Sequence, residues 1–209
     1  MTHRHWVFDM DGTLTLAAHD FEAIRRELGL PSGAPIVRTL NALPAEQAAP
    51  LRAKLQEIEE DLARQARPAP GVYELLEALR ERGCQMGILT LNSRENAWIT
   101  LKCLGLDAYF APGTVLGRWC LPNPKPAPDG VRHLLESWDA STRDAVMVGD
   151  YRWDLETGRA AGVTTIHVDL SGTHPWPELA DHCFSSLGQL RESLSSTHER
   201  SRARKLCKK

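Results

Sequence analysis

The feature that most constrains the fold is a regular alternation of short apolar runs with amphipathic helical patterns. Helical periodicity follows the apolar runs over residues 71–82, 96–104, 129–138 and 154–161. Strands that alternate with helices pair in parallel and are covered on both faces, so the sequence predicts an α/β fold with a parallel sheet. The apolar runs that read as strands are residues 5–9, 85–90, 114–116, 145–149 and 164–168.

One segment interrupts this alternation. Between Leu16 and Pro70 there is no strand pattern, and two apolar stripes at helical spacing take its place. Residues 17–68 are therefore predicted to form a helical cap, inserted between core segments 1–16 and 69–197. Its position directly after the first strand suggests a lid over a site there, and a helical pair packed elsewhere is the alternative. The stripes are Phe21, Ile24 and Leu28, then Leu51, Leu55, Ile58 and Leu62.

Charge is distributed unevenly along the 209-residue chain. Residues 198–209 contain six Lys or Arg and one Glu, so this tail carries a net charge of +5 and the first 197 residues carry −7. The acidic body argues against a broad nucleic-acid-binding surface, which would be basic. The tail is expected to be disordered and solvated, and binding of RNA or anionic lipid by it is the less favoured alternative.

Cysteine usage and the length of the apolar runs indicate a reduced, cytoplasmic protein. The five cysteines are widely spaced without a C-x-x-C pair, which favours free thiols, and the histidines show no H-E-x-x-H or comparable spacing. No secretory apolar segment opens the sequence and no apolar run approaches a membrane span, so no membrane partner is expected.

Two carboxylates stand at the end of the first predicted strand. Asp9 and Asp11 are separated by one residue and are followed by Gly12 and Thr13. Residues i and i+2 of a strand lie on the same side, so the two side chains are expected to project together. Two close anions raise each other's pKa unless a cation or a shared proton relieves the repulsion. For this segment on its own, a solvated Asp-Gly turn is the alternative.

Further polar residues follow other predicted strands or precede a helix. Open α/β sheets bind ligands at the carboxyl ends of their strands, so these residues are expected to converge. Taken singly, each residue can have a purely structural role, such as a local hydrogen bond, a solvated lysine or a helix cap. The combination favours a ligand-binding or catalytic site. The residues are Thr90, Leu91 and Asn92 after the second run, Lys125 between two prolines, and Asp150 with Asp154 after the fourth run.

These residue types fit phosphoryl transfer. That reaction needs an in-line nucleophile, positive charge on the phosphoryl oxygens and a proton for the leaving group. Asp9 is the predicted nucleophile, and Asp11 is the predicted general acid and base. Mg²⁺ prefers oxygen ligands, which Asp9, Asp150 and Asp154 supply.

Binding of the phosphate is assigned to residues beyond the carboxylates. Lys125 places a positive charge on the phosphate and offsets the crowded acidic groups. Thr90 and the nearby backbone N–H groups of Leu91 and Asn92 bind the remaining oxygens. Within the cap, His19 and Arg25 are the candidates to contact an anionic substrate, and His19 comes first because it lies beside the hinge.

Four segments form an ordered set along the chain. They are Asp9-Met10-Asp11-Gly12-Thr13, then Thr90, then Lys125, and finally Gly149-Asp150 with Asp154. In these motifs, over about residues 7–168, the sequence resembles hydrolases of the haloacid dehalogenase superfamily, in the phosphoglycolate-phosphatase-like branch with a small helical cap. The resemblance implies a modified Rossmann-like sheet, Mg²⁺ dependence, an aspartyl-phosphate intermediate and metal ligation by the backbone carbonyl of Asp11.

We therefore predict a Mg²⁺-dependent phosphatase that hydrolyses a small phosphomonoester. One alternative is a phosphomutase of the β-phosphoglucomutase type, which uses the same intermediate but returns the phosphate to a sugar. Another alternative is a non-catalytic binder of phosphorylated ligands, which is disfavoured because a binder has no need of Asp11. The motifs do not address the oligomeric state or the identity of the phosphorylated metabolite.

Overall fold

A six-stranded parallel sheet lies at the centre of the molecule. The computed structural model describes residues 1–17 and 20–194. The strand order is β3-β2-β1-β4-β5-β6, and every neighbouring pair is parallel. The predicted α/β fold and its five strands are confirmed, and β6 is an addition that the sequence pattern does not predict. The strands are β1 (His5–Phe8), β2 (Gln85–Leu89), β3 (Val115–Leu116), β4 (Ala145–Gly149), β5 (Thr164–Val168) and β6 (His182–Phe184).

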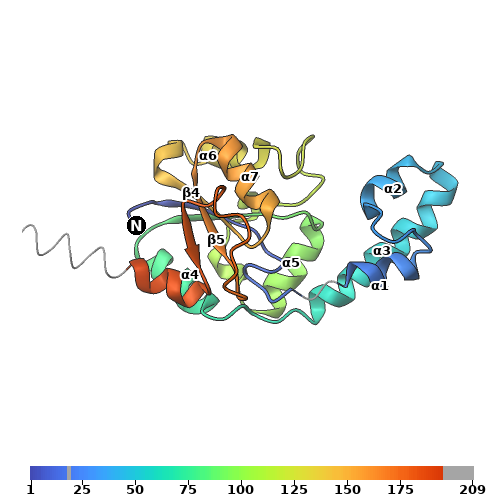
Figure 1. Cartoon of the computed structure of the whole chain (residues 1–209), viewed down its shortest axis with the longest axis horizontal. Helices are drawn as coiled ribbons and strands as arrows, with labels where there is room; N and C mark the ends of the chain where they lie inside the picture. The colour runs from blue at the N-terminus through green and yellow to red at the C-terminus, as the bar shows by residue number, and fades with distance from the viewer. Residues whose placement is uncertain (18–19, 195–209) are drawn as a thin grey trace, which may run out of the picture.

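Helices cover both faces of the sheet (Figure 1). Alternation along β1 shows how the faces divide, because Trp6 and Phe8 pack into one hydrophobic cluster and Val7 packs into another. The first cluster lies beneath α4 (Val72–Glu81), α5 (Arg94–Cys103) and a helical segment at 187–194, and the second lies beneath α6 (Asp129–Ser137) and α7 (Arg152–Ala161). Short 3₁₀ turns are η1 (Asp107–Tyr109), η2 (Pro112–Thr114) and η3 (Thr142–Asp144).

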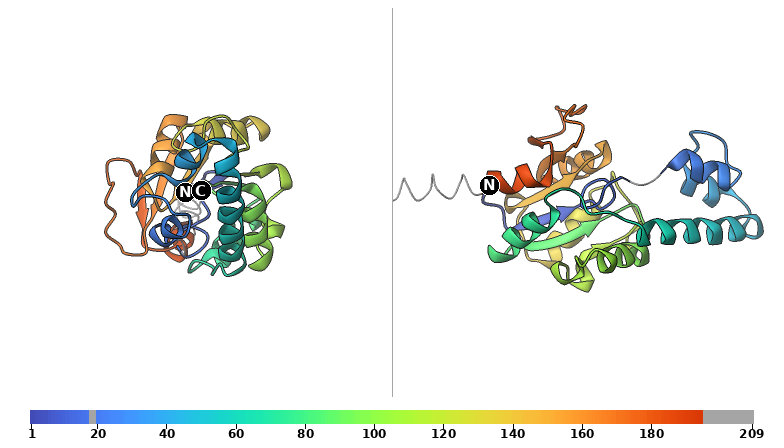
Figure 2. Two further views of the ribbon diagram at one scale, coloured as in Figure 1. Left: turned by 90° about the vertical axis from the view of Figure 1, so that its right-hand side faces the viewer. Right: turned by 90° about the horizontal axis from the view of Figure 1, so that it is seen from below.

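Three further helices form a lobe beside this core (Figures 1 and 2). They enclose a hydrophobic cluster of their own, built on Ile24, Leu28, Leu40 and Leu55. The first and third helices carry the two apolar stripes read from the sequence, and the second is not predicted. No helix within residues 1–17 and 20–194 is long and apolar enough to cross a membrane. The helices are α1 (Phe21–Glu27), α2 (Ile36–Ala42) and α3 (Ala45–Arg64).

The two chain segments that join lobe and core run side by side. The Leu16 N–H donates to the Arg67 carbonyl at 2.9 Å, and the Ala69 N–H donates to the Leu14 carbonyl at 2.9 Å. These antiparallel hydrogen bonds form a two-stranded connection immediately after the loop that carries Asp9 and Asp11. The lobe is therefore attached close to the predicted site.

A buried ion pair fixes α3 to the core. The Glu59 carboxylate of α3 is only 9% exposed and accepts hydrogen bonds from the Arg118 guanidinium at 3.0 and 2.5 Å. Asn96 of α5 lies 3.4 Å from the same carboxylate and donates to it. Glu59 lies four residues after Leu55, on the apolar face of α3. A charge on that face is a sequence signal of a tertiary partner.

Glu59→Gln is expected to lower the free energy of unfolding by about 3 kcal/mol, because it leaves the Arg118 charge buried without its counter-charge. Urea unfolding followed by tryptophan fluorescence measures this loss. Glu57→Gln is the matched control, since Glu57 is exposed on the same helix and its replacement is expected to change stability by less than about 0.5 kcal/mol. Equal stabilities of the two variants would contradict the assigned role of the ion pair.

Candidate active site

Three carboxylates converge where the two central strands end. Asp9 follows β1 and Asp150 follows β4, and the connections leave the sheet in opposite directions between these neighbouring strands. The Asp9 N–H donates to the Val148 carbonyl at 2.9 Å and fixes the end of β1 against β4. Asp154 adds a third carboxylate from the first turn of α7. One oxygen from each of the three lies within 4.8 Å of the others.

The loop after β1 is shaped to approach Asp150. Gly12 has a φ of 96°, and a Cβ there would lie 2.4 Å from an Asp150 carboxylate oxygen, so only glycine fits. The Thr13 hydroxyl donates to Asp150 at 2.9 Å and lies 3.5 Å from Asp9 Oδ2. Thr13 thus links the carboxylates of β1 and β4. The sequence motif contains this residue, but no role was predicted for it.

Lys125 is the cation at the centre of the cluster. Its Nζ lies 2.5 Å from Asp9 Oδ1 and 2.6 Å from Asp154 Oδ1, and its side chain is 4% exposed. Burial lowers the pKa of Lys125. The nearby charges of Asp154 and Asp9 together raise it by a larger amount, so the pKa lies above the usual lysine value. Asp154 also accepts the Tyr151 N–H at 3.1 Å through its other oxygen. The helix-capping and site roles of Asp154 therefore coexist.

The cluster holds more negative charge than Lys125 offsets. Burial, followed by the charges of Asp9 and Asp154, raises the pKa of Asp150 to about 7. Burial also raises the pKa of Asp154 to about 6, with Lys125 opposing and Asp9 reinforcing the rise. Oxygen donors with uncompensated charge fit a hard divalent cation such as Mg²⁺, which would favour the ionised carboxylates.

Asp11 makes a different contact from Asp9. The Thr90 hydroxyl at the end of β2 donates to Asp11 Oδ2 at 3.4 Å and accepts the Asn92 N–H at 3.0 Å. Asp9 gathers with Asp150 and Asp154, and Asp11 meets Thr90, while the joint projection of Asp9 and Asp11 stays a prediction. Metal ligation by Asp11 stays a prediction, since the resemblance assigns it to the backbone carbonyl.

The loop after Thr90 is held by the Asn92 side chain. Asn92 Oδ1 accepts the Ser93 N–H at 2.8 Å and the Asn96 amide at 3.3 Å. The Asn92 carbonyl accepts the Arg118 N–H at 3.0 Å. These contacts give the side chain a loop-shaping role, and phosphate binding by Leu91 and Asn92 stays a prediction.

The two predicted specificity residues of the cap differ in what the structure shows. Arg25 Nε donates to the Ala34 carbonyl at 2.7 Å, and its guanidinium pairs with Glu22 at 2.8 Å. Both partners belong to the lobe, so these contacts stabilise the lobe itself, and substrate contact by Arg25 stays a prediction. His19 and the basic tail at 198–209 lie outside the described residues.

Comparison with known proteins identifies the family. Residues 6–168 match the family model of haloacid dehalogenase-like hydrolases. The chain belongs to the haloacid dehalogenase-like hydrolase family. The predicted membership is thereby confirmed, and the four motifs all fall within the matched residues.

Individual relatives of this hydrolase agree with that assignment. Pyrophosphatase PpaX of Bacillus velezensis is 32% identical over 180 residues, which cover 78% of this chain and 81% of that protein. Phosphoglycolate phosphatase of Mesorhizobium japonicum is 30% identical over 193 residues, covering 80% and 83%. The crystal structure of a hydrolase from Pseudomonas syringae matches with a TM-score of 0.76 and 26% identity, covering 92% and 98%. The predicted resemblance to phosphoglycolate phosphatases is confirmed.

The metal-free hydrolase is expected to lose stability as the pH rises through neutrality. An acid with a raised folded-state pKa stabilises the fold fully below its ordinary pKa of 3.8, and the contribution is lost as the pH passes its folded value of about 7. Asp150→Asn removes that ionisation and can still accept the Thr13 hydroxyl. In EDTA, its Tm should exceed that of the wild type above neutral pH and should match it in acid.

Thermal unfolding across the pH range measures this difference. Asp107→Asn is the control, because Asp107 is exposed on η1, away from the cluster. A Tm of Asp150→Asn at or below the wild-type value above neutral pH would show that burial and neighbouring charge do not disfavour the ionised Asp150 in the folded state.

Proposed function

We propose that this hydrolase is a Mg²⁺-dependent phosphatase that releases inorganic phosphate from a small phosphomonoester. The observation that carries the proposal is the buried Lys125, bonded to Asp9 and Asp154, with Asp150 in the same cluster. This arrangement offers a nucleophile and a cation within one desolvated space, as phosphoryl transfer requires. The names of the relatives, a pyrophosphatase and a phosphoglycolate phosphatase, support the same chemistry.

Asp9 is the proposed nucleophile. Lys125 holds its Oδ1 at 2.5 Å, and Thr13 lies 3.5 Å from its Oδ2, so both oxygens are oriented. An oxygen of Asp9 attacks phosphorus as the ester P–O bond breaks in line, which leaves an aspartyl phosphate and the substrate alcohol. Lys125 is close enough to Asp9 to stabilise the charge on the phosphoryl oxygens.

Asp11 is the proposed general acid and base. It gives a proton to the departing alcohol oxygen, and then takes one from the water that attacks the phosphorus of the aspartyl phosphate. The second step restores the Asp9 carboxylate and releases inorganic phosphate. The Thr90 hydroxyl, 3.4 Å from Asp11 Oδ2, orients this carboxyl group.

Asp9, Asp150 and Asp154 are the proposed protein ligands of Mg²⁺, together with the backbone carbonyl of Asp11. Bound Mg²⁺ supplies the positive charge that allows a carboxylate to approach an anionic phosphate. The raised pKa values of Asp150 and Asp154 support this assignment, because both carboxyl groups are buried and also face other carboxylates, and a divalent cation would favour their ionised forms.

The lobe is the proposed cap of the site. We assign it residues 17–68, with residues 1–16 and 69–197 as the core. Its separate hydrophobic cluster and its paired connection next to the Asp9 loop support a unit that covers bound substrate. We place the reaction in the cytoplasm, which the four free cysteines within residues 1–17 and 20–194 support.

Asp9→Asn is expected to abolish hydrolysis, because an amide cannot form the aspartyl phosphate. The experiment is a panel of small phosphate esters, with p-nitrophenyl phosphate as the generic reporter, assayed with Mg²⁺ and then with EDTA. Asp107→Asn is the control and should retain wild-type activity. Near-wild-type activity of Asp9→Asn would overturn the mechanism. Phosphate moved along a sugar without net release would instead identify a phosphomutase, and no turnover of any ester would favour a binder.

Asp11→Asn is expected to lower kcat by about 10²–10⁴-fold, the usual contribution of a general acid and base. Mg²⁺ affinity should change little, since the three carboxylates of the cluster are untouched. Steady-state kinetics and isothermal titration with Mg²⁺ measure the two effects. A loss of Mg²⁺ affinity that accounts for the whole loss of activity would assign Asp11 a structural role instead.

A further inference from the structure

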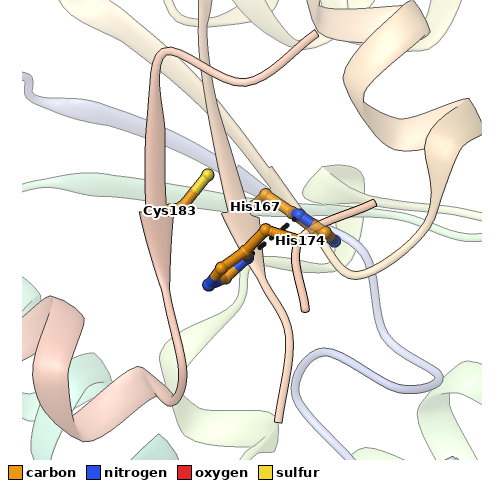
Figure 3. A group of neighbouring side chains, drawn as sticks. All are labelled: His167, His174 and Cys183. Atoms are coloured by element: carbon orange, nitrogen blue, oxygen red, sulfur yellow. Dashed lines mark hydrogen bonds between the residues drawn. The ribbon is translucent and has the colours of Figure 1, made fainter. Parts of the chain in front are cut away.

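Two histidines and a cysteine from β5, β6 and the segment between them converge beside β5 (Figure 3). His167 of β5 pairs in register with Cys183 of β6, so the two side chains lie on the same face of the sheet. His174 reaches them from the connection between the two strands. One ligand atom from each residue lies within 4.8 Å of the other two. This group is separate from the carboxylates that serve the proposed reaction.

The buried His167 ring has one nitrogen available for a metal. Its Nε2 lies 3.0 Å from the Asp150 carbonyl oxygen, which can only accept a hydrogen bond. Nε2 therefore carries the proton, and Nδ1 presents a lone pair. Histidines that bind metals commonly donate their other ring N–H to a backbone carbonyl in this way, which fixes the tautomer and the orientation of the ring.

The spacing of the two rings suits a shared ion. His167 Nδ1 and His174 Nδ1 are 3.3 Å apart, and the ring planes meet at 74°. Two nitrogens bound to one tetrahedral Zn²⁺ are also about 3.3 Å apart, because each Zn–N bond is about 2.0–2.1 Å. An ion can therefore replace the hydrogen bond between the rings without a change in their separation.

Neighbouring residues fix the position of His174 and shield His167 from water. The Asp169 carboxylate accepts the His174 N–H at 2.8 Å and the Thr173 hydroxyl at 3.1 Å, which fixes the loop that carries the second ring. Trp176 packs against His167 at a centroid distance of 5.5 Å and excludes water from one side. Cys183 is exposed, so the sulfur side of the group faces solvent.

We propose that His167, His174 and Cys183 form a second metal site, which binds Zn²⁺. Imidazole nitrogen and thiolate sulfur are the ligands that Zn²⁺ prefers, whereas the carboxylate cluster suits Mg²⁺. Because His167 also holds the Asp150 carbonyl, an ion at this site stiffens the backbone at the base of the carboxylate cluster. Its role is to support that backbone, and it takes no part in the reaction steps.

The test is titration of the full-length protein with Zn²⁺ and, separately, with Co²⁺, in excess Mg²⁺ so that the carboxylate cluster is saturated. The wild type should show a sulfur-to-cobalt charge-transfer band in the near ultraviolet. Cys183→Ser should lose the band, and Cys183→Ser and His174→Ala should each bind Zn²⁺ at least about tenfold more weakly. Cys103→Ser and His182→Ala are matched controls, because both side chains are exposed and outside the group, and they should behave as the wild type.

A wild type without the band, or a Cys183→Ser variant that keeps it, would overturn the site. Thermal unfolding gives a second readout that does not depend on colour. Zn²⁺ should raise the Tm of the wild type and of His182→Ala, since a ligand of the folded state stabilises it, and at the same concentration should raise that of Cys183→Ser by clearly less. An equal rise in all variants would place the ion elsewhere.

Discussion

The site depends on one lysine ammonium buried among three carboxylates. Parallel pairing of β1 with β4 places Asp9 and Asp150 at the same edge, and the first turn of α7 adds Asp154. Lys125 offsets part of this charge, but burial and then the remaining carboxylate charges still raise the pKa values of Asp150 and Asp154. The fold therefore stores an unbalanced negative charge at the point where a divalent cation and an anionic substrate are proposed to bind.

The helical lobe and the loop after Thr90 are linked through one residue, Arg118. The Arg118 guanidinium holds Glu59 of α3, and the Arg118 backbone N–H holds the Asn92 carbonyl. Any shift of α3 relative to the core therefore acts on the same segment that shapes the proposed phosphate-binding loop. This link gives a physical route by which closure of the proposed cap over substrate would reach the proposed catalytic residues.

The sequence predicts the elements that follow from local hydrophobic patterns, and the site residues that stand at the carboxyl ends of strands. Short apolar runs followed by helical patterns reveal five strands, and the convergence of Asp9 with Asp150 follows from the parallel pairing of β1 with β4. β6 escapes prediction because its three residues are largely exposed, and α2 because it is one short helix that starts after Pro35. The Glu59–Arg118 pair joins residues far apart in the chain, so spacing alone cannot reveal it. The contact of Asp11 with Thr90 likewise depends on the path of the loop after β1, and the spacing of Asp9 and Asp11 along the chain does not predict it.

The two candidate metal-binding groups within residues 1–17 and 20–194 differ in the atoms that they offer. The carboxylate cluster offers only oxygen, whereas the group beside β5 offers nitrogen and sulfur, and Asp150 touches both through different atoms. Zn²⁺ generally binds oxygen, nitrogen and sulfur donors more strongly than Mg²⁺ does, so an enzyme that uses Mg²⁺ is exposed to displacement of its cofactor. The imidazole and thiolate donors of the proposed second site therefore select a different ion from the oxygen donors of the proposed Mg²⁺ site. The hydrogen bond from His167 to the Asp150 carbonyl links the two groups, so an ion on the first would support the backbone that carries a ligand of the second.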